Sequence, residues 1–232
     1  MKHLIIARYR EDAGWLKDIN FPIYLYDKSY KAHVCNDNTN IIQQTLPNIG
    51  REAHTYNQYI LDNYYCLPDI CIFSQCSPFE HVENFIDIIN KDTIEEMWQE
   101  NLKCYPDSES SHDGFLGLGK SSKINLQANH GEENFWWLKF KVKNVYSSLL
   151  ANNLPQKYTT SHGAIMVVKK ENILSNPIKV YERMMTLHEN TNFPAFDWSN
   201  ETAVALEHLW TIIFKKEIGI LSENKEIEKW II

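Results

Sequence analysis

The sequence lacks the features that would indicate a membrane or an oxidising compartment. No segment approaches the ~20 apolar residues of a membrane span, and the start, MKHLIIARYR, has too short an apolar run for a signal peptide. The five cysteines form no CxxC pair and no Cys/His zinc spacing, and their odd number suits free thiols in a reducing compartment. We therefore expect a soluble, cytoplasmic protein without a membrane span.

Positive charge is also scarce. The formal net charge of −7 argues against nonspecific binding along a nucleic-acid backbone, which requires a basic face. We expect no nucleic-acid partner, although a local basic pocket for a diphosphate is compatible with this total.

The composition is that of a folded domain. Hydrophobic residues make up 44% and charged residues 23% of the 232 residues, which are ordinary globular values. The length suits one large domain, so we predict a single domain over residues 1–232 with an amphipathic tail at 219–232.

Short apolar runs that end in polar residues alternate with helical patterns. His3 to Ala7, Ile23 to Tyr26, Ile70 to Phe73 and Gly163 to Val168 have the character of buried strands in a largely parallel sheet. Helical spacing is clearest after Asn48, which we expect to be the N-cap. Further helices are predicted from Pro78, over 177–188 and over 199–214. Residues 135–151 also alternate as in a strand, but their length favours a helix. About 100–134 is predicted to be a long loop or lid. The fold class is therefore α/β, with ligands at the carboxyl edge of the sheet.

The segment after Asn48 is the first candidate for ligand binding. Gly50 would let a ligand approach the start of a helix, and Arg51 can bind phosphate oxygens bidentately. His54 and Thr55 fall on the same predicted polar face as Arg51. The alternative is an ordinary solvated helix face.

A second candidate directly follows a predicted strand. Gln75 and Ser77 lie where open α/β sheets usually contact ligands, in the stretch Ser74 to His81. The alternative is a plain strand-to-helix turn with Ser77 as its N-cap.

Two carboxylates are candidates for acid–base chemistry. Glu207 falls on or beside the apolar stripe of the last predicted helix, and a carboxylate at such a seam has either a partner or a raised pKa. It is therefore a candidate general base, with a structural ion pair as the alternative. Asp197 is the second candidate, and its position suits a helix N-cap equally well.

Gly114 to Ser121 matches the P-loop pattern GxxxxGK[ST]. That motif requires a hydrophobic strand before it and a helix after it, and the flanking residues predict neither. We interpret the match as accidental, and a flexible glycine-rich lid as an alternative use of the segment.

Several segments together resemble a known family. They run from Leu4-Ile5-Ile6-Ala7-Arg8-Tyr9 through Gly50-Arg51-Glu52-Ala53-His54-Thr55-Tyr56, Leu67-Pro68-Asp69, Phe73-Ser74-Gln75 and Pro78-Phe79 to Glu207-His208-Leu209-Trp210. This set is similar to a family labelled only as a domain of unknown function, whose members resemble glycosyltransferases of the GT-A type. The resemblance spans most of the chain, and the GREAHTY stretch is its most specific part.

The resemblance implies a GT-A-like sheet and a nucleotide-sugar donor, such as a UDP- or GDP-sugar, held at the ends of the first strands. It implies that Arg8, Tyr9 and Asp27 lie near the base and ribose, and that Arg51 lies near the phosphates. His162 would contact the donor or the acceptor. Glu207, or failing that Asp197, would deprotonate a hydroxyl of a glycan acceptor.

The chain departs from the GT-A pattern because it contains no Asp-x-Asp metal motif. Either His81 and Glu80 help to hold Mg²⁺ or Mn²⁺, or cationic side chains such as Arg51 stabilise the leaving diphosphate. Trp136 and Trp137 could stack on acceptor sugars or pack in the core. Two other functions remain open, a P-loop-type nucleotide phosphotransferase and a noncatalytic glycan-binding module.

Overall fold

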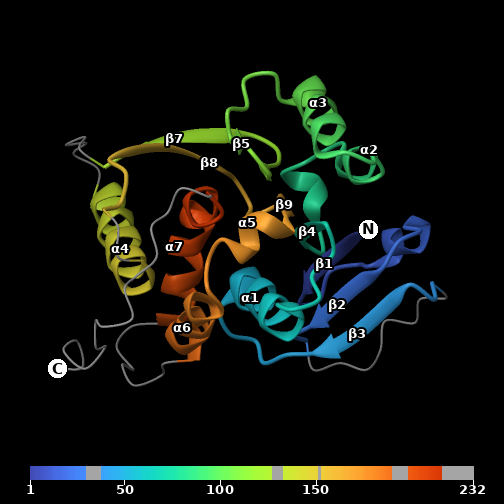
Figure 1. The fold of residues 1–232 in the computed structure, drawn as a ribbon, viewed down its shortest axis with the longest axis horizontal. Coiled ribbons are helices and arrows are strands. Elements are labelled where there is room, and N and C mark those ends of the chain that lie inside the picture. Colours follow the sequence, from blue (N-terminus) through green and yellow to red (C-terminus); the bar gives the residue numbers. More distant parts are fainter. Residues whose placement is uncertain (30–37, 127–132, 151–152, 190–197, 216–232) are drawn as a thin grey trace.

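The computed structural model describes residues 1–29, 38–126, 133–150, 153–189 and 198–215. They form one α/β domain built on a seven-stranded mixed sheet in the order β3-β2-β1-β4-β9-β6-β5, with β7 and β8 in a separate two-stranded sheet (Figure 1). The strands are β1 (Lys2–Arg8), β2 (Ile23–Asp27), β3 (Ile41–Thr45), β4 (Ile70–Gln75), β5 (Ser111–His112), β6 (Phe115–Gly117), β7 (Ser121–Asn125), β8 (Lys157–Ser161) and β9 (Met166–Lys169).

The first four strands form the parallel part of the sheet. β1 pairs with β2 on one side and with β4 on the other, and β3 extends the sheet beyond β2. The register aligns the carboxyl ends of these strands, because Arg8 lies opposite Asp27 and Ala7 lies opposite Gln75. β9 then pairs antiparallel with β4 and with β6, so the sheet is mixed.

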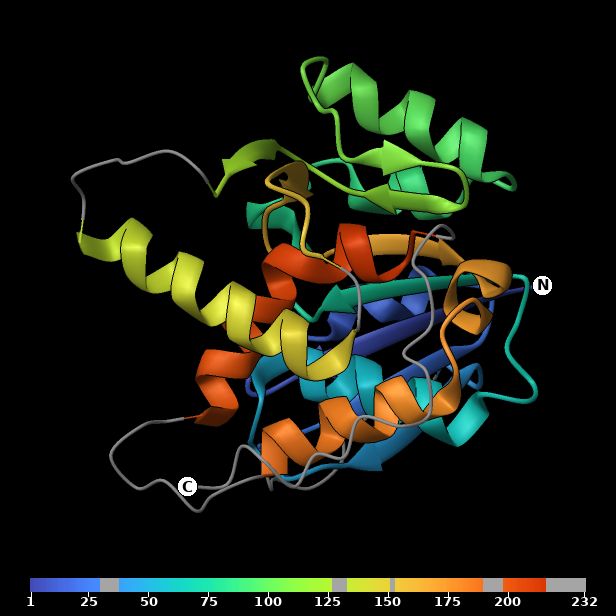
Figure 2. The same cartoon turned by 60° about the vertical axis from the view of Figure 1, so that its left-hand side comes forward.

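Helices cover both faces of the sheet (Figure 2). The helical elements are η1 (Gly14–Asp18), α1 (Arg51–Asn63), η2 (Pro78–Glu80), α2 (Phe85–Ile89), α3 (Ile94–Cys104), α4 (Glu133–Leu149), α5 (Lys170–Leu174), α6 (Ile178–Glu189) and α7 (Trp198–Ile213). α1, α4, α6 and α7 bury one apolar core against the sheet, and η1, α2 and α3 bury a second core against its other face.

The alternation of strand residues explains the two cores. In β1, Ile5 joins the core under α1, whereas Leu4 and Ile6 join the core on the opposite face. Successive side chains of a strand point to opposite faces, and here both faces are covered. The continuous apolar run of β1 is the pattern expected of such a strand.

The predicted strands at 3–7, 23–26 and 70–73 are confirmed as β1, β2 and β4, and the predicted helices at 135–151, 177–188 and 199–214 as α4, α6 and α7. The prediction of a long loop over 100–134 was wrong, because this stretch contains the end of α3 and the strands β5 to β7. These strands are short. β6 and β7 pair with β9 and β8, which lie far along the chain, and β5 pairs with β6. A continuous helix from Pro78 was also wrong, since the chain forms the short helices η2 and α2 there.

Candidate functional site at the carboxyl edge of the sheet

The topology itself selects one place for a ligand. β2 and β4 lie on opposite sides of β1, so the connections after β1 and β4 leave in different directions. In open α/β sheets such a switch point opens a crevice at the carboxyl ends of the strands. The residues that follow β1, β2 and β4 are therefore the first candidates for contacts to a ligand.

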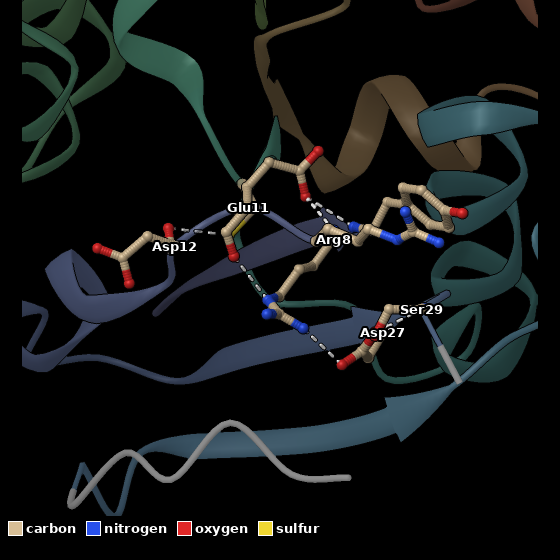
Figure 3. Close-up of polar contacts among 8 residues, drawn as sticks. Arg8, Glu11, Asp12, Asp27 and Ser29 are labelled. Atoms are coloured by element: carbon tan, nitrogen blue, oxygen red, sulfur yellow. Dashed lines mark hydrogen bonds and ion pairs between the residues drawn. The ribbon is translucent and has the colours of Figure 1, made fainter. Parts of the chain in front are cut away.

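Arg8 and Asp27 join the ends of β1 and β2 (Figure 3). Arg8 Nη1 donates to Asp27 Oδ2 at 2.7 Å, and Arg8 Nε donates to the carbonyl of Glu11 at 2.9 Å. Asp27 Oδ1 accepts the Ser29 amide at 2.7 Å, and the Asp27 side chain is only 2% exposed. Both carboxylate oxygens of Asp27 are thus engaged within the chain, and the pair acts as a clamp that fixes the strand ends.

The turn after β1 leaves Tyr9 accessible. The amides of Tyr9 and Arg10 donate to Glu11 Oε2 at 2.7 and 3.0 Å, which orders the turn. The Arg10 guanidinium lies 4.6 Å from the centre of the Tyr9 ring. Tyr9 is 38% exposed, so it presents an aromatic surface beside the switch point.

The start of α1 has an unusual backbone. Gly50 and Arg51 both have positive φ angles, 59° and 46°, and Gly50 is the N-cap in place of the predicted Asn48. A Cβ atom on Gly50 would lie 2.5 Å from His188 Nδ1, so glycine is required there for space as well as for conformation.

The side chain of Lys28 stabilises this turn through hydrogen bonds. Its buried ammonium donates to the carbonyl of Ile49 at 2.7 Å and to the carbonyl of Arg51. Burial lowers the pKa of Lys28 to about 7, and the Glu52 carboxylate opposes that shift. The side chain of Arg51 remains 51% exposed, which leaves its guanidinium available at the edge.

His54 and Thr55 do not lie on a solvated helix face, contrary to the prediction. Both are buried, because α1 is covered by α6 and α7 as well as by the sheet. The His54 ring packs edge-on against His188 with 5.7 Å between ring centroids. Burial, with a smaller contribution from Lys28, lowers the pKa of His54 to about 4. These two residues support α1 internally.

The end of β4 is ordered by contacts to the turn after β1. The Cys76 amide donates to the carbonyl of Ala7 at 2.9 Å, and Trp15 Nε1 donates to the carbonyl of Cys76 at 2.9 Å. Gln75 Nε2 donates to the carbonyl of Ser77 at 3.2 Å. Gln75 and Ser77 therefore lie at the predicted edge and are bonded to each other.

The predicted metal ligands His81 and Glu80 do not form a protein-built metal site. The His81 ring lies against the backbone of Gly163, where an added Cβ would approach its Cδ2 atom to 2.8 Å. Across the described ranges, no three His, Cys, Asp or Glu side chains gather closely enough to hold an ion. The donor set of this edge thus does not fit a metal held by the protein alone.

Glu207 reaches the same region from α7. Its Oε1 accepts the amide of Gly163 at 2.9 Å, and its carbonyl accepts the Thr160 hydroxyl at 3.2 Å. Gly163 has a φ of 76° in the turn that leads into β9, so the hydrogen bond anchors that turn to α7. The neighbouring His162 is hydrogen-bonded through Nε2 to Ser122 Oγ at 2.7 Å, which ties it to β7.

Glu52 was missed by the sequence reasoning. It follows Arg51 directly, and a charged residue in a first helical turn usually faces solvent. Its side chain is only 11% exposed. Burial raises the pKa of Glu52, Arg51 and Lys28 lower it, and Glu207 raises it further. The sequence signal that could have pointed to Glu52 was its place within the GREAHTY stretch.

Three sequence candidates remain to be placed. Asp197 lies outside the described residues, as do the side chains of Trp136 and Trp137. Gly114 to Ser121 forms β6 and a turn into β7, so the strand, loop and helix of a P-loop are not formed. The interpretation of that match as accidental is supported by this geometry.

These observations define a single-domain α/β protein with polar and charged side chains gathered at the carboxyl edge of its sheet. Residues 4–227 match the model of the family described as Protein of unknown function (DUF3431), and the chain belongs to that family. No curated protein and no solved structure matches the chain. None of the helices within the described ranges has the length and apolar character needed to cross a membrane.

Proposed function

We propose that the carboxyl edge of the sheet binds a nucleoside diphosphate sugar, and that the protein transfers the sugar to a hydroxyl group of a glycan. The observation that carries this proposal is the exposed guanidinium of Arg51 at the start of α1, which Lys28 links to the carboxyl end of β2. A helix start offers unpaired amides to an anion, and an arginine binds phosphate oxygens in a bidentate manner.

The surroundings of Arg51 support a nucleotide rather than a simple anion. Tyr9 offers an exposed aromatic ring beside the ends of β1 and β4, suited to stacking on a nucleobase or sugar. The parallel strands β3, β2, β1 and β4 end at this edge, where the family resemblance implies that a GT-A-type enzyme holds its donor. The Arg8–Asp27 clamp keeps the ends of β1 and β2 in place beneath this position.

The proposed reaction is a direct displacement. The acceptor hydroxyl oxygen forms a bond to the anomeric carbon of the donor sugar while the bond from that carbon to the diphosphate oxygen breaks. The electron pair leaves with the diphosphate, whose growing charge is stabilised by Arg51 and the amides of α1. The hydroxyl proton passes to a carboxylate at the edge, and Glu207 is the one that the sequence assigns to this step.

A thermal-shift panel of UDP, GDP, CMP, ADP and ATP, each with and without Mn²⁺, tests the proposal. A nucleotide at 100 times its Kd adds about 2.7 kcal/mol to the free energy of unfolding. We expect one nucleoside diphosphate to stabilise the protein, and Arg51→Ala to abolish the effect. Lys103→Ala, on α3 at the far face of the sheet, should leave it unchanged.

Two other outcomes would contradict the proposal. Stabilisation by ATP alone, lost in Lys120→Ala and kept in Arg51→Ala, would indicate a phosphotransferase. Binding of oligosaccharides without any response to nucleotides would indicate a glycan-binding module. A response to a nucleoside diphosphate that requires Mn²⁺ agrees with the proposal and would indicate a metal site completed by the bound phosphates, for which Glu80 and His81 are the candidate ligands.

A further inference from the structure

Lys28 connects the elements that meet at the candidate site. Its amide donates to the carbonyl of Arg8 at 2.8 Å, which fixes the backbone of Lys28 to the end of β1. Its side chain is buried and extends from the end of β2 to the start of α1. There Nζ donates to the carbonyl of Ile49 at 2.7 Å and to the carbonyl of Arg51. One buried side chain therefore ties the start of α1 to the ends of β1 and β2.

The turn that Lys28 binds has an unfavourable backbone conformation. Gly50 and Arg51 have φ angles of 59° and 46°, and the left-handed region is costly for a residue with a side chain. Gly50 is the N-cap of α1 and makes no side-chain capping bond. Because one ammonium binds the carbonyls on both sides of Gly50, it favours the conformation that brings these two oxygens to the same point.

A lysine is an expensive residue for this purpose if only the fold is considered. A buried ammonium loses its hydration, and the start of a helix already carries a partial positive charge. Burial accordingly lowers the pKa of Lys28 to about 7, a shift that Glu52 opposes. A cation at this place is better accounted for by an anion that binds beside it.

Arg51 is the residue through which Lys28 reaches such an anion. The carbonyl of Arg51 is held by Lys28, whereas the side chain of Arg51 is 51% exposed. Arg51 Nε lies 3.7 Å from Glu52 Oε2, which is longer than a hydrogen bond. The backbone conformation at Arg51 sets the direction in which its side chain leaves the helix. If the turn relaxed to an ordinary helical φ, the guanidinium would point elsewhere.

We propose that Lys28 is a positioning residue of the diphosphate site. By binding the carbonyls of Ile49 and Arg51, it fixes the left-handed turn that directs the Arg51 guanidinium to the phosphates of the donor. Lys28 is buried and does not itself contact the donor. This inference rests on the proposed function and adds a residue that acts through Arg51.

The first test measures the affinity for UDP or GDP by calorimetric titration, with the nucleotide that stabilises the protein. Lys28→Met should raise Kd by about 10-fold or more, because a misdirected guanidinium loses its bidentate contact. Lys2→Met is the matched control, since Lys2 Nζ also donates to two carbonyls, those of Ile89 at 2.8 Å and Lys91 at 2.9 Å, at the opposite end of β1. This control should keep Kd within about twofold of the wild type.

A second measurement follows Arg51 directly. The Nε–H resonance of Arg51 can be assigned by its absence from the spectrum of Arg51→Ala. It should shift when nucleotide is added to the wild type and to Lys2→Met. In Lys28→Met at equal saturation it should stay near its position in the free protein, a pattern that a general loss of structure would not produce.

A second variant keeps the test valid if Lys28→Met does not fold. The amide of Lys28→Gln can still donate to the two carbonyls, but from a shorter side chain. It should therefore show the same increase in Kd and the same reduced shift of the Arg51 resonance, to a smaller extent.

The possible failures are distinguishable. A wild-type protein that binds no nucleoside diphosphate would overturn the proposed function and this inference together. Loss of binding in Arg51→Ala, with wild-type Kd and a wild-type Arg51 shift in a folded Lys28 variant, would overturn only the role of Lys28. An equal increase of Kd in Lys2→Met and Lys28→Met would show that Lys28 serves the fold alone, and would also overturn its positioning role.

Discussion

At the scale of single residues, Lys28 shows how a buried side chain stabilises the candidate site. Its ammonium is buried under the start of α1 and is bonded to two main-chain carbonyls. It was not a sequence candidate, because one lysine after a strand is indistinguishable from a surface lysine until the turn above it is known. His54 and Thr55 were sequence candidates, but both are buried, and their burial depends on α6 and α7 rather than on their own helix.

Lys28 should give the protein a measurable pH dependence. Its pKa is about 7 in the folded chain and near 10.5 when unfolded. Between these values the unfolded state binds more protons, so the contribution of Lys28 to the free energy of unfolding rises with pH. Lys28→Met should therefore show a smaller rise than the wild type between pH 7 and 9.5 in urea unfolding. Equal slopes for the two proteins would contradict the lowered pKa.

His54 should affect the free energy of unfolding at acidic pH. Its pKa is lowered to about 4 from 6.5, so the unfolded state binds more protons between these values. Stability from this group is therefore lost as pH falls from about 6.5 to 4. His54→Phe should flatten this acid limb of the unfolding curve, and His3→Phe in β1 provides a comparison at a second buried histidine with a smaller downward shift of its pKa. An unchanged acid limb in His54→Phe would show that His54 is protonated in the folded state.

At the scale of elements, α1 begins with the backbone strain of the edge. Arg51 adopts a left-handed conformation that costs an ordinary residue about 1–2 kcal/mol. Lys28 and the packing around Gly50 hold it there. Strain of this kind is found where the surrounding structure fixes a functional geometry.

Substitutions at Arg51 should separate strain from ligand binding. The free energy of unfolding of Arg51→Gly should exceed that of Arg51→Ala by about 0.5–1 kcal/mol. Glycine adopts this φ without strain, but the greater entropy of its unfolded chain cancels part of the gain. Both variants should lose nucleotide binding equally. Urea unfolding and the thermal-shift panel measure the two effects. A glycine variant no more stable than the alanine variant would argue against a strained turn.

α3 offers a test of local helix stability away from the site. Thr93 Oγ1 accepts the Glu96 amide and Glu96 Oε2 accepts the Thr93 amide, each at 3.2 Å, in a capping box. Thr93→Ala should cost about 1 kcal/mol. Thr186→Ala on the exposed side of α6 should cost less than about 0.5 kcal/mol. Equal losses in the two variants would show that the capping box contributes nothing.

Elements were predictable from sequence where the signal is local. β1, β2 and β4 are apolar runs bounded by polar residues, and α1 and α7 have clear helical spacing. β5 and β6 have two and three residues, and β7 begins Ser-Ser-Lys, so none has a recognisable pattern. β6 and β7 are held by β9 and β8, which no local window contains, and β5 pairs with β6.

At the scale of the whole molecule, one sheet separates two cores. Leu4 belongs to the core under η1, α2 and α3, and Ile5 belongs to the core under α1, α6 and α7. Because adjacent residues of a single strand serve both cores, neither core can lose its packing while the other keeps the sheet. The cores are therefore one cooperative unit.

Truncation of either residue should destabilise the entire molecule. Leu4→Ala and Ile5→Ala should each cost about 2–5 kcal/mol, as for other fully buried side chains. In both variants, near- and far-ultraviolet circular dichroism should give coincident transitions. Two separated transitions in either variant would contradict a single unit.

The edge is assembled during synthesis in the order of its residues along the chain. Arg8, Lys28 and Glu52 emerge from the ribosome early, whereas Gly163 and Glu207 come from the last third of the chain. A nascent chain that has completed β4 therefore presents Arg8, Lys28 and Glu52 without Gly163 and Glu207. If the chain is cut between α3 and β5, each fragment carries half of the edge, and recovery of the native circular dichroism spectrum on mixing would report directly on their association.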